Sequence, residues 1–132
     1  MKVILLTILL YSTGLNRLQT PQQSFKISTY TNVPKDFTGC GNAFYLSQRD
    51  KKAGKTICLT HFNKALIYMN NKLIRLTEDH KSTNNGEHLY TMGSYTLTTK
   101  LDHEYYVMKG IMVIKYRNKV IWSKKVIGEG GC

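Results

Sequence analysis

Cys58 and His61 lie three residues apart, and a thiol near an imidazole could serve as a nucleophile and its base. Residues 55–62 around them have the composition of a β-strand. Because successive side chains of a strand point to opposite faces, residues three apart face away from each other. We therefore expect no catalytic thiol here, and interpret Cys58 as a small buried hydrophobic residue.

The remaining groups that could transfer protons or bind metal fall in expected turns, loops or strand ends. Such residues usually face water. The sequence contains no ligand cluster with the spacing of a zinc site, and no pair of carboxylates like that of a glycosidase can be identified. The residues concerned are His61, His80, His88, His103, Glu78, Asp79, Asp102 and Glu104. We expect no catalytic residue, no metal and no cofactor, and therefore a protein that is not an enzyme. The alternative is an enzyme that acts on wall carbohydrate through acids that this pattern does not reveal.

The three cysteines predict one disulfide and one free thiol if the chain is exported. Cys40 and Cys132 are flanked by glycines, which allow close approach, whereas Cys58 lies in an apolar stretch. We predict a disulfide between Cys40 and Cys132, which would stabilise the fold by about 4 to 5 kcal/mol in the chain-entropy model.

Aromatic rings near lysines form the candidate binding surface. Tyr105 and Tyr106 are adjacent, so on a strand at least one of them could point outward, and Trp122 is close to Lys124 and Lys125. Rings among cations bind sugars or bases by stacking and cation–π contact. The candidate residues are Tyr106, Trp122, Lys124 and Lys125. The alternative is that these rings belong to the core of a small β domain.

The elements that must position these residues are expected to be strands. Short β-branched and aromatic runs are separated by turn residues, and Asn70-Asn71 favours a two-residue hairpin turn. Polar turns are expected at 49–54, 102–103 and 117–119, and a loop at 78–87. The expected strands are residues 43–48, 55–62, 65–69, 72–77, 88–92, 94–101, 104–108, 110–116 and 120–127. About eight short strands predict an all-β fold, a small antiparallel β-barrel or sandwich.

The N-terminus has the pattern of a secretory signal peptide. Lys2 precedes the apolar run 3–11, and cleavage after Gly14 or Thr20 is open. A membrane span would need roughly 20 apolar residues, and Asn16 and Arg17 come too early for that. We predict a signal peptide over 1–20, a flexible leader over 21–38, one β domain over 39–132, and a secreted or periplasmic location. The alternative is that the run is a buried N-terminal strand.

The chain is strongly basic. Removal of residues 1–20 takes away Lys2 and Arg17 and leaves 17 basic and 8 acidic residues, a balance of +9. Such a charge attracts polyanions, which outside the cytoplasm include lipid headgroups, wall polymers, nucleic acid and acidic proteins. The alternative is that dispersed lysines only maintain solubility, since no run of five cations occurs.

Two stretches resemble the small secreted β-barrel family of bacterial lysozyme inhibitors. They are ALIYMNNKLIRL (65–76) and LYTMGSYTL (89–97), an apolar strand, tight turn and second strand followed by a strand of the form aromatic-x-x-x-Gly-x-x-x-Leu. The resemblance implies a small barrel fold. The Ser-Gly and Tyr signature of that family's inhibitory loop is missing, and a basic protein would repel the basic enzymes that the family commonly opposes.

These patterns together favour an exported, monomeric β domain that binds an anionic envelope or extracellular partner, either a polyanion or a protein. The alternative function is inhibition of a secreted hydrolase such as lysozyme by a protruding loop, for example 78–87.

Overall fold

The structure, a computed structural model of the chain, describes residues 24–81, 86–104 and 107–131. Short strands dominate it, with one α-helix and one 3-10 helix between them. In chain order the elements are β1 (Ile27–Ser28), η1 (Lys35–Phe37), β2 (Gly41–Tyr45), α1 (Gln48–Lys52), β3 (Cys58–His61), β4 (Lys64–Met69), β5 (Lys72–Glu78), β6 (Glu87–Met92), β7 (Tyr95–Glu104), β8 (Val107–Tyr116) and β9 (Lys119–Gly131).

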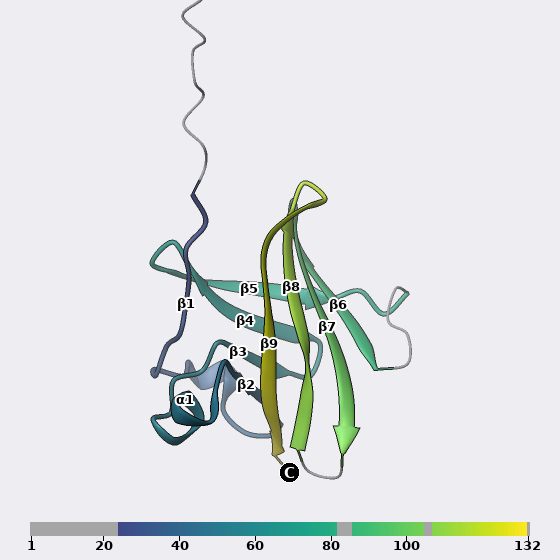
Figure 1. Cartoon of the computed structure of the whole chain (residues 1–132). Helices are drawn as coiled ribbons and strands as arrows, with labels where there is room; N and C mark the ends of the chain where they lie inside the picture. Colours follow the sequence, from purple (N-terminus) through teal and green to yellow (C-terminus); the bar gives the residue numbers. More distant parts are fainter. Residues whose placement is uncertain (1–23, 82–85, 105–106, 132) are drawn as a thin grey trace, which may run out of the picture.

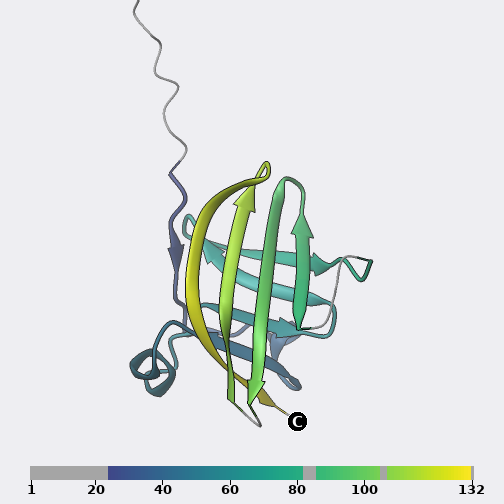
Figure 2. The same ribbon diagram turned by 45° about the vertical axis from the view of Figure 1, so that its right-hand side comes forward.

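Strands β2 to β9 form a closed antiparallel barrel of eight strands. Each strand pairs with the next one along the chain, and β9 returns to pair with β2. The extra strand, β1, pairs with the end of β4. Figures 1 and 2 show β2–β5 running across β6–β9, as in orthogonally packed sheets. The all-β class and the small antiparallel barrel predicted from the sequence are confirmed.

Side-chain alternation determines which residues fill the barrel. On β7 and β8, Leu97 lies opposite Ile114 and Thr99 lies opposite Met112, and all four are almost completely buried. Cys58, on β3, belongs to the same hydrophobic cluster, which confirms its interpretation as a small buried residue. The period-2 pattern of the sequence therefore corresponds to one apolar core inside the barrel.

Two hairpins turn on paired residues with positive φ. Asn70 and Asn71 have φ values of 51° and 63°, which confirms the tight turn predicted there. Arg117 and Asn118 join β8 to β9 in the same way, with φ values of 48° and 64°. Backbone of this kind matches the twist of paired strands, and asparagine tolerates it better than most residues.

The polar turn expected at 49–54 contains helix α1 instead. Ser47 caps the helix by accepting a hydrogen bond from the backbone N–H of Asp50 at 3.1 Å, and Gly54 follows the helix with a φ of 67°. A serine cap and a C-terminal glycine are thus the local signals for this short helix. None of the helices in the described ranges is long and apolar enough to cross a lipid bilayer.

Strands β7 and β8 are longer than the sequence predicts. The turn expected at Asp102-His103 lies inside β7, and the runs expected on either side of Lys109 form a single strand, β8. Gly110 causes no break in it. A Cβ atom at this position would lie 2.1 Å from the carbonyl oxygen of Lys100, so the glycine allows β7 and β8 to approach closely.

Residues 24–38, which composition places in a flexible leader, pack against the barrel. Tyr30 and Phe37 form a second hydrophobic cluster with Leu59 and Leu66, on the outer side of β3 and β4. The Tyr30 hydroxyl donates a hydrogen bond to the carbonyl oxygen of Leu66 at 2.7 Å. Only Tyr30 and Phe37 among residues 24–38 are buried, which is why a polar composition conceals this packing.

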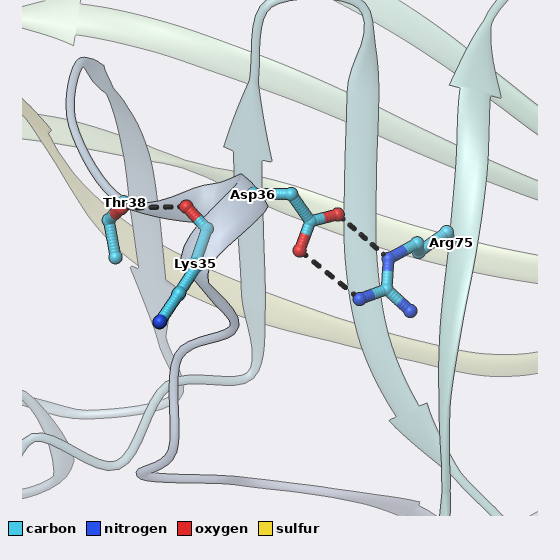
Figure 3. Close-up of polar contacts among 4 residues, drawn as sticks. All are labelled: Lys35, Asp36, Thr38 and Arg75. Carbon is cyan, nitrogen blue, oxygen red and sulfur yellow. Dashed lines mark hydrogen bonds and ion pairs between the residues drawn. The ribbon is translucent and has the colours of Figure 1, made fainter.

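An ion pair connects η1 to β5 (Figure 3). Nε and Nη2 of Arg75 donate hydrogen bonds to the two carboxylate oxygens of Asp36, at 3.0 and 3.2 Å. The hydrogen bond from Arg75 lowers the pKa of the Asp36 carboxyl group. The guanidinium also lies 6.0 Å from the centre of the Phe37 ring. Both charges are exposed to water, and an exposed ion pair contributes little to the free energy of unfolding. We therefore assign this pair the role of positioning η1 against β5.

Leu76 and Leu73 lie on the same strand but face opposite sides, which gives a matched pair of variants. Leu76 is completely buried and Leu73 is 38% exposed. We expect Leu76→Ala to lower the free energy of unfolding by about 2–5 kcal/mol, because it leaves a cavity in the core. Leu73→Ala should lower it by less than about 1 kcal/mol. Urea denaturation followed by circular dichroism measures both, and equal losses would contradict this assignment of faces.

Candidate binding surface

Residues 107–126, which we call the basic hairpin, comprise β8, the turn and the first part of β9. They include six cationic residues and no acidic residue. All six cationic side chains are exposed; they are Lys109, Lys115, Arg117, Lys119, Lys124 and Lys125. The hairpin therefore concentrates the positive charge that the sequence only shows as dispersed.

Strand register determines how these cations are distributed. Lys125 pairs with Ile111 on the outer face, whereas Lys124 pairs with Met112, whose side chain lies in the core. Lys124 is nevertheless exposed, because β2 pairs only with residues 127–131 of β9 and leaves this part of the strand uncovered. The hairpin consequently presents cations from both of its faces and from its turn.

Most charges of the basic hairpin have no acidic partner among the described side chains. In the described part of the chain, every ion pair lies elsewhere, and examples are Lys51 with Glu129 and Arg75 with Asp36. On the adjacent strand, residues 95–101 of β7 contain no acid, and the first acidic neighbour is Asp102, opposite Lys109. Uncompensated charge of one sign gives a positive potential that attracts anions.

The residues predicted as a binding surface have different environments. Trp122 is half-buried and packs against the core, while Lys124 and Lys125 are exposed on opposite faces. Tyr106 lies outside the described residues. A contact between a cation and a ring does occur on the hairpin, where the Arg117 guanidinium lies 5.3 Å from the centre of the Tyr116 ring. The signal for it was the adjacency of Tyr116 and Arg117 before a predicted turn.

The outer face of the basic hairpin contains a hollow of about 310 Å³. Its apolar part includes Ile111, which is 46% exposed, and Ile127, and its charged residues are Lys109, Lys125 and Asp102. Register explains the pattern, since Ile111 pairs with Lys125 while Lys109 pairs with Ile127. Apolar and cationic side chains thus alternate on this face, which suits a ligand with both apolar and anionic groups.

A cluster of polar side chains lies at the short β5–β6 contact, where two residue pairs are in register. The Glu78 carboxylate lies 3.0 Å from Nδ1 of His88 and 3.8 Å from Nδ1 of His80. Tyr90, opposite Glu78, is buried, and this burial raises the pKa of its hydroxyl. The sequence placed Glu78 and His88 at the two sides of a loop and missed this contact. The inward alternation of Leu76 with Glu78 and of His88 with Tyr90 was the available signal.

Cys58 and His61 do not form a catalytic pair. The Cys58 side chain is fully buried in the barrel, and burial raises the pKa of its thiol to about 12. His61 lies on the other side of the strand, where its Nδ1 donates to the carbonyl oxygen of Cys40 at 2.5 Å. The opposite orientations expected from strand alternation are confirmed. No group of three metal-ligating side chains occurs within the described ranges.

The ends of the folded region meet where the disulfide is predicted. Gly41 of β2 is in register with Gly131 of β9, and these residues directly follow Cys40 and directly precede Cys132. A Cβ atom at position 41 would lie 2.1 Å from the carbonyl oxygen of Thr60, so glycine is required there. Cys132 lies outside the described residues, while Cys58 is a free buried cysteine.

Comparison with protein families, curated protein sequences and solved structures finds no match for this chain. Its function must therefore be inferred from its own residues and their geometry.

Proposed function

We propose that this chain is an exported, non-enzymatic binding protein whose basic hairpin binds an anionic envelope or extracellular partner. The observation that carries this proposal is the group of six exposed cations in residues 107–126, without an acid among them. The alternation of Ile111 with Lys125 adds apolar contact area beside the charges. Long-range attraction would speed association, and the apolar contacts would then slow dissociation.

The chemistry of the other titratable groups supports a binding role over catalysis. Glu78 and His88 face each other at the short β5–β6 contact, where their pairing holds two strands together. The His61 imidazole points away from the Cys58 thiol, and the raised pKa of this thiol keeps it protonated at neutral pH, so it is a poor nucleophile. The exposed cations, in contrast, are available to a partner.

Export is proposed from the N-terminal pattern over 1–20 together with the cysteines. A disulfide between Cys40 and Cys132 would fasten the β2–β9 pairing, because Gly41 and Gly131 are already in register beside them. The basic hairpin would then meet the anionic polymers and acidic proteins found outside the cytoplasm.

Neutralising part of the basic hairpin should weaken binding to heparin, used here as a model polyanion. For the triple variant Lys115→Gln, Lys119→Gln and Lys125→Gln, we expect the slope of log affinity against log salt to fall by about two, because fewer counterions are released. The control variant Lys52→Gln, Lys55→Gln and Lys72→Gln changes exposed residues outside the hairpin by the same charge. A salt series on a heparin column measures both slopes. Equal reductions would contradict a role for the hairpin, and no retention of the wild type at low salt would refute polyanion binding.

The cysteines give a prediction about export. Under non-reducing conditions, we expect a peptide map to contain one linked pair, Cys40 with Cys132. Iodoacetamide should modify Cys58 at pH 8 only after denaturation, because the thiol is buried and its pKa is raised. A bridge that includes Cys58 would contradict the assignment, and three free thiols in protein purified from the medium would contradict the disulfide altogether.

A second proposal, inhibition of a secreted hydrolase, is favoured by Phe62 at the tip of the β3–β4 hairpin. Its side chain is 83% exposed, and its φ of 51° is unusual for a bulky residue. The His61 ring lies 4.4 Å from the Phe62 ring, and the tip has only two residues between paired strands. A rigid aromatic tip of this kind is suited to insertion into the cleft of another protein.

Phe62→Ala tests this second proposal. If the tip inserts into an enzyme cleft, inhibition of lysozymes of several classes at micromolar concentration should weaken about 30-fold, corresponding to the loss of about 2 kcal/mol at an anchor residue. The melting temperature should not fall, since the ring is solvent-exposed. Absence of inhibition by the wild type, or equal inhibition by the variant, would refute it.

A further inference from the structure

Strand β9 has an edge that is only partly paired. It contains 13 residues and pairs with β8 along nearly all of its length, but β2 pairs only with residues 127–131. Within the described ranges, no other strand pairs with the remaining edge over residues 119–126. In Figure 2 this part of β9 forms the margin of the curved sheet β6–β9. We call residues 119–126 the open edge.

An open edge carries backbone groups that can pair with another extended chain. Five of its eight side chains are exposed, since Val120 is 59% exposed and Lys119, Ser123, Lys124 and Lys125 are also exposed. An eight-residue edge is as long as a typical strand. Peptide recognition by strand addition uses such edges, with backbone hydrogen bonds for affinity and alternate side chains for selectivity.

The open edge also has features that prevent indiscriminate pairing. The register shifts between Ile114 and Lys115, so that Ile121 forms a bulge in β9, and three of the eight residues are lysines. Bulges and lysines are common on strand edges that must avoid aggregation. Lysines, however, reject only neutral or cationic strands. They favour a strand that carries carboxylates, and a second copy of this chain, with its formal net charge of +11, is repelled.

We propose that the open edge accepts an extended acidic segment of a partner protein as an additional β-strand. This inference rests on the proposed function and names the partner class. Outward positions of the added strand would lie beside Ser123 and Lys125, where carboxylates are favoured. The alternate positions would lie on the face that Trp122 shares with Lys124, where the Trp122 ring, which packs against the core, offers apolar contact. The preferred ligand is therefore a segment in which acidic and apolar residues alternate.

The probe is an eight-residue peptide of alternating Glu and Val, blocked at both ends. Its control replaces two Val residues with Pro, which keeps the charge but prevents strand pairing. We expect isothermal titration calorimetry to show at least tenfold tighter binding of the Glu–Val peptide than of the Pro control. Hydrogen exchange of the full-length protein should show amide protection over 119–126 when the Glu–Val peptide is bound.

The outcomes separate this inference from the proposed function. Equal affinity for the two peptides, together with salt-dependent retention on heparin, would overturn strand addition but keep the basic hairpin as an anion-binding surface. Amide protection confined to strands other than β9 would also overturn strand addition at the open edge. Failure to bind either peptide or heparin would refute the proposed function. Concentration-dependent dimerisation that protects residues 119–126 without any peptide would overturn the addition of a partner strand, because a second copy of the chain would then occupy the open edge.

Discussion

Closure of the barrel between β2 and β9 is the constraint on which the rest of the structure depends. It requires backbone positions without a Cβ atom, since a Cβ at Gly128 would lie 2.8 Å from the Phe44 ring. The pairing is short because β2 ends at Tyr45 and the chain then turns into α1. Within the described ranges, only residues 127–129 of β9 are therefore paired on both edges, and the rest of the strand has one neighbour. The β2–β9 pairing thus closes the barrel at the C-terminal end of β9 and leaves the open edge at the N-terminal end of the same strand.

The N-terminal segment supplies packing where strand pairing is incomplete. The Phe25 ring lies 5.2 Å from the Tyr116 ring and 6.1 Å from the Tyr95 ring, at the end of the barrel where β8 turns into β9. Ile27 packs against the core, and Tyr30 and Phe37 cover the outer side of β3 and β4. The two ends of this segment thus stabilise two separate parts of the barrel. The basic hairpin is held near its turn by aromatic contacts while its cations face water.

The features that the sequence predicted are local or periodic. Alternation along β8 and the Asn70-Asn71 turn depend on neighbouring residues, so the sequence contains them directly. Helix α1 was missed because its cap and terminal glycine are also turn signals. The Glu78–His88 contact and the burial of Tyr30 depend on residues distant in sequence or on a partner strand. Local alternation indicates which way Glu78 and His88 point, but not that the two side chains meet. The lysines of the candidate surface were recognised individually, but their concentration on one hairpin follows from the pairing of β8 with β9.

Charge and edge geometry reinforce each other on β9. A neutral open edge would pair with any extended chain, including other copies of the protein, and a cationic surface without an edge would bind polyanions with little selectivity. Lysines on the edge impose a charge requirement, and the backbone imposes a requirement for an extended ligand. Three of the eight acidic residues are engaged elsewhere in the fold, since Asp36 pairs with Arg75, Glu129 with Lys51 and Glu78 with His88. Because these acids are engaged within the fold, none of the three neutralises the lysines of the open edge.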